Sequence, residues 1–444
     1  MKARLRKFLS TLSETFWLVP GAMTLGGILL AAAFVQIDAA DLLPAWFVES
    51  DYLYNGGGTG ARTLLGVVAS STIGVAGTVF SITIAALSFA AGQMGPRLLR
   101  NFIRDRGNQV TLGVFLGTFS YALMVLRAVR TQGEGEFVPH LSLSVGILLA
   151  FICVGTLIYF VGHMAGRINV DTVIDLVSED VRDAIARLTV AERQPDPPPS
   201  DIWRDAALIT DTRRGYLQQL DCAGLAAWAS DRQAMVHLLV RPGDYLFPGA
   251  PVALVRPAVE GCDLALRNAL ALGSRRGSPA DLEFCIRQLV EVAVRALSPG
   301  INDPHTAVSV LDRLGVALCD LVPQHLASGL TFVDGRLAVV MPPVDYDGLV
   351  DAMFNMIRQY GGTSPAVLIR MLDVLTAVAS CERDPLRLRA LGRHADLVVD
   401  DARRLVASPA DVSAVEQRHR DFTVMRDHGP LARIYARRRA PDSL

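Results

Sequence analysis

Lysine is almost missing from this chain of 444 residues, because the only two are Lys2 and Lys7 and the remaining Lys-or-Arg positions are all arginine. A Walker-type phosphate loop, a Schiff-base lysine and a kinase-type lysine each need a lysine in the folded domain. All three are therefore excluded beyond residue 7. The soluble part also lacks GxSxG, HExxH and GxGxxG contexts. We predict that the chain is not an enzyme and carries no cofactor.

The sequence also lacks a CxxC motif among its six cysteines. Almost all of them lie on the predicted cytoplasmic side of the membrane, where thiols stay reduced. The histidines of the soluble part show no metal-ligand spacing. The sequence therefore predicts no disulfide framework and no metal site. No nucleic-acid partner is expected either.

Charge is scarce in the first third of the chain and ordinary in the remainder. The whole is 51% hydrophobic with a formal net charge of -1 and a mean hydropathy of +0.33, which indicates a membrane part joined to a soluble part. Residues 1–168 are the predicted transmembrane domain. Its four apolar runs, each long enough to cross a bilayer as a helix, cover residues 16–37, 64–92, 110–129 and 141–163.

Basic residues mark one side of this predicted domain. They precede the first span, fill residues 97–106 between the second and third spans, and follow the fourth at Arg167, whereas acidic residues lie in the other two loops. The positive-inside rule then places both termini in the cytoplasm. Because the first apolar run is longer than a signal-peptide core and three more spans follow, we expect it to be retained in the bacterial inner membrane.

The soluble part begins with a helical connector and a proline-rich linker over residues 169–200. A small β-module is predicted for residues 201–262, where VRPGDYLFPGAPVALV resembles the half-motif of barrel-sandwich hybrid domains. That resemblance implies shape alone, since carrier domains of this fold need a lysine. Residues 263–444 are predicted to be mainly helical and cytoplasmic. Helices are expected at 279–297, 304–321, 345–360, 364–380, 385–407 and 409–424, with a hairpin at 330–341 that turns at Asp334 and Gly335.

Small residues recur every three or four positions along the second span. Helical spacing places them on one face, which predicts either close helix packing or a polar path through the membrane. A homo-oligomer with this face on its central axis satisfies both interpretations. The residues are Ser71, Gly74, Thr78, Ser81, Ala85, Ser88 and Gly92.

The cytoplasmic end of the second span is followed by Gln93, Arg97, Arg100 and Arg104. These arginines anchor the helix at the inner leaflet or, alternatively, form a pore mouth that favours anions. The centre of each predicted span lacks Asp, Glu, Lys and Arg. A proton-coupled pump usually needs such a residue, so transport of small ions, if it occurs, is expected to be passive.

The string RALSPGINDPHTAVSVLDRL forms the most distinctive polar turn. Asp303 is predicted to cap a helix that starts at Pro304. An alternative is that the turn gathers oxygen atoms around an ion or a phosphate-bearing ligand. The residues concerned are Ser298, Asn302, Asp303, His305 and Thr306.

Two strings resemble the bacterial predicted-membrane-protein family called domain of unknown function 2254: TVFSITIAALSFAAGQMGPRLLRNFIRDR with the following LGVFLGTFSYALMVLRAV, and ALSPGINDPHTA. The resemblance runs over nearly the whole chain and implies an inner-membrane location without an activity. Our first hypothesis is an oligomeric, passive, channel-like protein with the second span near the conduction axis. The alternative is a non-conducting scaffold or sensor in the bilayer whose cytoplasmic part binds a ligand or protein.

Overall fold

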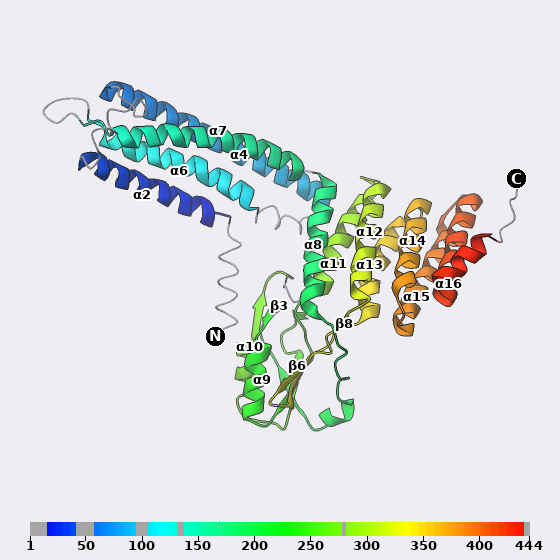
Figure 1. The fold of residues 1–444 in the computed structure, drawn as a ribbon. Helices are drawn as coiled ribbons and strands as arrows, with labels where there is room; N and C mark the ends of the chain where they lie inside the picture. The colour runs from blue at the N-terminus through cyan, green and yellow to red at the C-terminus, as the bar shows by residue number, and fades with distance from the viewer. Residues whose placement is uncertain are drawn as a thin grey trace. The chain divides into compact units, whose positions relative to one another are not determined.

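The computed structural model describes residues 16–40, 57–94, 105–130, 137–167, 169–277 and 281–438. They belong to two compact units, divided between residues 169 and 170. Four candidate membrane helices come first, and a mixed α/β region and a helical C-terminal part follow (Figure 1). This order of elements is the one that the sequence predicts.

The first unit contains four helices that are long and apolar enough to cross a bilayer. Each overlaps a predicted span and extends past it at one end or at both, because flanking polar residues can continue the backbone hydrogen bonds of a helix. The helices are α2 (Leu18–Ala39), α4 (Gly58–Met94), α6 (Arg106–Ala128) and α7 (His140–Arg167).

Helix α6 is the centre of this unit, since it packs against α2, α4 and α7 and has the most buried apolar stretch of the four helices. Helices α2 and α6 approach one another closely at glycine residues. A Cβ atom on Gly27 of α2 would collide with the backbone oxygen of Gly117, and one on Gly117 would lie 3.0 Å from the carbonyl oxygen of Met23. Gly113 and Gly117 form a GxxxG motif, which lets two membrane helices touch through their backbones.

Asp38, near the end of α2, caps the start of α7. Its carboxylate accepts hydrogen bonds from the backbone nitrogens of Leu141 and Ser142, at 3.1 and 3.0 Å, and from the Ser142 hydroxyl at 2.6 Å. The Tyr121 hydroxyl of α6 donates to the Ser142 carbonyl at 2.8 Å. Because free N–H groups at a helix start attract an anionic acceptor, this contact ties three of the helices together at one end.

Helices α8 and α11 to α16 of the second unit stand side by side in a row (Figure 1). The predicted helices are present there, and α12 has the predicted bounds. The last helix runs beyond the predicted residue 424 and is kinked at Gly429, whose φ of 74° is left-handed. The bounds are α8 (Val170–Leu188), α11 (Leu282–Ala296), α12 (Pro304–Leu321), α13 (Tyr346–Gly361), α14 (Pro365–Cys381), α15 (Pro385–Leu405) and α16 (Pro409–Arg438).

Two sheets share one apolar core beside this row. A five-stranded sheet has the order β2-β6-β4-β10-β9, in which only the β4 and β10 pair is parallel, and a three-stranded antiparallel sheet has the order β5-β3-β7. The strands are β2 (Ala207–Thr210), β3 (Gly215–Leu220), β4 (Met235–Leu238), β5 (Tyr245–Leu246), β6 (Pro251–Arg256), β7 (Leu270–Gly273), β9 (Leu330–Val333) and β10 (Arg336–Val340).

The sheets extend beyond the predicted module of residues 201–262, because β7, β9 and β10 pair with its strands. The predicted hairpin is confirmed as β9 and β10, with φ values of 48° at Asp334 and 77° at Gly335. Helices α9 (Cys222–Asp231) and α10 (Cys262–Ala269) contribute Leu225 and Leu266 to the same core. The likeness to a barrel-sandwich hybrid stays a prediction. A short ladder of β1 (Thr189–Val190) and β8 (His325–Leu326) and the 3-10 turn η1 (Ser200–Trp203) complete the elements.

Candidate functional site

The small residues of the second span all lie on α4, and we call them the α4 seam. All seven are exposed: Ser71, Gly74, Thr78, Ser81, Ala85, Ser88 and Gly92. A Cβ atom on Gly74 or Gly92 would have no neighbouring atom within 4 Å. The described residues of the subunit therefore leave the α4 seam uncovered.

The opposite side of α4 makes the contacts inside the unit. Thr72, Ala76, Val79 and Ala86 are buried there, in the region where α4 packs against α6 and α7. At 3.6 residues per turn, these positions point roughly away from the α4 seam. The seam is thus free to face lipid or a second copy of the chain.

Hydroxyl groups on the α4 seam donate their protons to the helix backbone. Ser71 donates to the Val68 carbonyl at 3.1 Å, Thr78 to Gly74 at 3.2 Å and Ser81 to Gly77 at 2.9 Å. Each hydroxyl oxygen keeps lone pairs that can accept. A row of such oxygens can replace part of the hydration shell of a cation but offers few donors to an anion.

The predicted mouth is only partly described. Arg97, Arg100 and Arg104 lie outside the described residues, and so does the side chain of Gln93, although its backbone belongs to α4. Sequence reasoning missed another polar group near this end. His163 Nε2 lies 2.6 Å from Asp105 Oδ2, and Asp105 also caps α6.

The polar turn before α12 has the predicted cap geometry. One oxygen of Asp303 accepts from the backbone nitrogens of His305 and Thr306, and the other accepts from the Thr306 hydroxyl at 2.6 Å. The hydroxyl hydrogen bond from Thr306 holds the pKa of Asp303 below its ordinary value. Ser298 donates to the Arg295 carbonyl at 2.6 Å, and Asn302 has a left-handed φ of 51°. The helix cap accounts for the contacts of Asp303, His305 and Thr306, whereas the Ser298 hydroxyl bonds to the end of α11.

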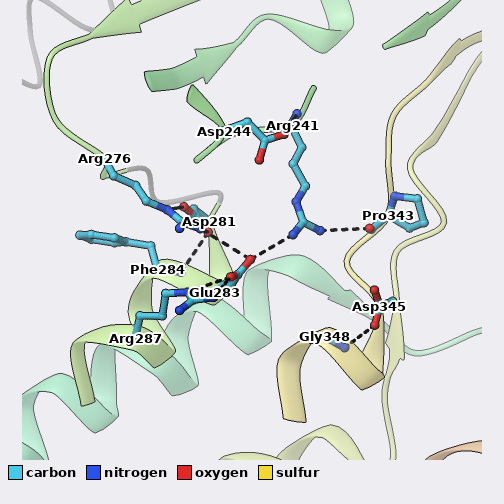
Figure 2. Close-up of polar contacts among 10 residues, drawn as sticks. All are labelled: Arg241, Asp244, Arg276, Asp281, Glu283, Phe284, Arg287, Pro343, Asp345 and Gly348. Atoms are coloured by element: carbon cyan, nitrogen blue, oxygen red, sulfur yellow. Dashed lines mark hydrogen bonds and ion pairs between the residues drawn. The ribbon is translucent and has the colours of Figure 1, made fainter. Parts of the chain in front are cut away.

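A cavity of about 340 Å³ lies in the second unit where the loop after β4 meets α11 and α13, and we call it the Glu283 pocket. Sequence reasoning missed it, because its wall comes from distant segments. Figure 2 shows Arg241 reaching from that loop to Glu283, at 3.0 Å, and to the carbonyl of Pro343, at 3.1 Å. Lining residues include Arg241, Glu283, Arg287, Asp345, Asp351 and Met356.

Glu283 is the electrostatic centre of this pocket. Arg287 contacts its carboxylate at 2.6 Å, Arg241 at 3.0 Å and Arg276 at 3.6 Å (Figure 2). Burial alone would raise the pKa of Glu283, but the Arg287 hydrogen bond and the charges of the three arginines outweigh burial and lower that pKa. Glu283 is therefore ionised. Because it lies on α11 while Arg241 and Arg276 lie in loops that follow strands, its ion pairs join the helical row to the β-strand region.

Asp351 connects the pocket wall to a buried histidine. Its Oδ1 lies 2.8 Å from Nε2 of His394 and 2.9 Å from Arg393. The His394 side chain is fully buried, and its Nδ1 has no hydrogen-bond partner among the described residues. Burial lowers the pKa of His394, and the opposing hydrogen bond that His394 donates to Asp351 does not reverse that shift. The imidazole therefore binds a proton less readily in the folded chain than in the unfolded chain.

We expect acid to destabilise the second unit through His394. Its folded pKa lies below the unfolded value of about 6.5, so below that pH the unfolded chain binds a proton that the folded chain does not. Stability should fall by up to about 1.4 kcal/mol per pH unit for this histidine. Urea midpoints between about pH 7 and pH 5 should fall less in His394→Gln than in the wild type. The exposed His305→Gln is the control, and parallel curves for wild type and His394→Gln would contradict the expectation.

Comparison with known proteins gives a family match. The family model described as "Predicted membrane protein (DUF2254)" matches residues 13–377. Uncharacterized proteins of Mycobacterium tuberculosis and Mycobacterium bovis are each 33% identical over 368 residues, which is 80% of this chain and 70% of each relative. No solved structure matches the chain significantly.

Proposed function

Since the chain belongs to the family of predicted membrane proteins DUF2254, we propose that it is a homo-oligomer that conducts small ions passively, with the α4 seam on the conduction axis. The observation that carries this proposal is the exposure of all seven seam residues, on the side of α4 away from its partner helices. Rows of small residues allow close approach between membrane helices. A second copy of the chain is the occupant that such a face suits.

Ion preference and the soluble unit complete the proposal. The hydroxyls of Ser71, Thr78 and Ser81 donate their protons to carbonyls of their own helix. Their oxygen lone pairs remain able to contact an ion, which favours binding of K⁺ or Na⁺ over Cl⁻. The second unit, with its barrel-sandwich-like sheets, is proposed to lie in the cytoplasm of the bacterial inner membrane and to assemble or gate the oligomer. Both termini are on that side, and no catalytic step is assigned to the chain.

Ser81→Leu is expected to reduce ion flux to the background of empty liposomes, because leucine fills the seam with an apolar side chain. The test reconstitutes the full chain into liposomes and measures K⁺, Na⁺ and Cl⁻ flux. Thr156→Leu on α7 is the matched control, since that hydroxyl also donates to its own helix, to Ile152 at 2.8 Å. The control should keep its flux, and all variants should keep one oligomer size in detergent.

Two results would overturn conduction along the α4 seam. One is unchanged flux and assembly in Ser81→Leu. The other is no flux in the wild type under voltage, membrane tension or changed pH. The second result would favour a ligand-binding sensor held in the bilayer, which the Glu283 pocket supports because its wall joins the two parts of the soluble unit.

A further inference from the structure

Two free cysteines that are far apart in the sequence meet at the ends of two helices. Cys319 lies in the last turn of α12, and Cys381 is the last residue of α14. The two helices pack against one another, and the side chain of Cys381 lies close enough to Cys319 to affect its thiol. The two cysteines belong to no sequence motif, so their proximity could be recognised only from the fold.

Solvent reaches the two thiols unequally. Of the six cysteines, all within the described residues, Cys381 is the exposed one, whereas Cys319 is half-buried. Burial and the neighbouring Cys381 raise the pKa of Cys319, which keeps that thiol protonated and less reactive. An oxidant in solution therefore meets Cys381 first.

Arg387 of α15 fixes the two helix ends beside the thiols. It donates to the carbonyl of Leu321 at 3.0 Å and to that of Gln324 at 2.7 Å, just after Cys319. It also lies 3.4 Å from a carboxylate oxygen of Glu382, the residue after Cys381. The arginine side chain is only 11% exposed, and its contacts hold the two helix ends that carry the thiols next to one another.

We propose that Cys319 and Cys381 are a redox-sensitive modification site that forms a reversible disulfide with hydrogen peroxide as the oxidant. The Cys381 thiolate attacks peroxide, so that an S–O bond forms, the O–O bond breaks and hydroxide leaves to become water. Cys319 then gives up its proton and attacks the sulfenic sulfur, which forms the S–S bond and releases a second water. Two thiols lose two electrons and two protons, and one peroxide becomes two waters.

The test treats the purified full chain in detergent with hydrogen peroxide, blocks remaining thiols with an alkylating reagent and maps the peptides without reductant. We expect one dominant linked peptide, joining Cys319 to Cys381, which a dithiol reductant separates. Cys262→Ser should form that link at the wild-type rate, because Cys262 is not part of the pair. Cys381→Ser and Cys319→Ser should each abolish it.

The alternative outcomes are distinct. Oxidation of Cys381 to sulfinic acid without the link would overturn the proposal, as would links involving Cys222 or Cys262 in similar yield. Unfolding the wild type in urea before peroxide treatment provides a control for proximity, and an equal yield of the Cys319–Cys381 link there would also overturn it. The site does not depend on ion conduction, so either result stands apart from the flux measurement.

Discussion

Gly27→Leu should separate α2 from α6 and lower the stability of the membrane unit by about 3 kcal/mol or more. The first added carbon meets the backbone oxygen of Gly117, and a backbone atom cannot move aside as a flexible side chain can. Helices in lipid associate through close van der Waals contact, so a forced gap removes the interaction itself. Protease resistance and thermal unfolding of the full chain in micelles would measure the loss.

The neighbouring glycine supplies a matched control. A Cβ atom on Gly26 would have no neighbour within 4 Å, so Gly26→Leu makes the same change of side chain on the lipid-facing side of α2. It should keep the wild-type unfolding temperature. An equal loss of stability in Gly26→Leu and Gly27→Leu would contradict this account. It would mean that glycine is needed for the conformation of α2 itself and not for its contact with α6.

Asp401→Ala should cost the helical row about 3–5 kcal/mol, because it leaves a buried guanidinium without its counter-charge. Asp401 of α15 is paired with Arg358 of α13, and their side chains are only 5% and 11% exposed. The Arg358 Nε has no hydrogen-bond partner among the described residues, so this carboxylate is what compensates the charge. Urea unfolding of the full chain, followed by far-ultraviolet circular dichroism, would give the change in midpoint.

Asp400→Ala tests whether burial is the cause. Asp400 is the adjacent acidic residue on α15, 62% exposed, and its carboxylate lies 3.9 Å from the guanidinium of Arg403. Exposed pairs of this kind contribute about 0–1 kcal/mol. A loss of the same size in both variants would contradict the account of Asp401 as the partner of a buried charge.

Local signals were sufficient wherever a few neighbouring residues determine the structure. Asp303 followed by Pro304 places the start of α12 correctly, since the cap and the fixed proline angle act within one turn. Asp334 and Gly335 likewise determine the β9 and β10 turn, because both adopt left-handed φ. Hydropathy alone identifies the four membrane helices.

Contacts between distant segments were beyond the same reasoning. Periodicity assembles the α4 seam on one face, but it cannot say whether that face points inward, and the structure leaves it exposed. The glycine contact of α2 and α6 had a readable signal in the spacing of Gly113 and Gly117, which is the spacing that close helix pairs use. The Glu283 pocket had none, because Arg241 and Asp345 approach only after the strands and helices have packed.

The parallel pairing of β4 with β10 has a consequence for the order in which the chain is made. Val236 and His237 of β4 take Val339 and Val340 as neighbours, and α11 and α12 are translated between those strands. A ribosome therefore releases β4 with one hydrogen-bonding edge open, and that edge stays unpaired until the two helices have been synthesised. During this interval the nascent sheet is the part of the chain most in need of protection from pairing with another copy.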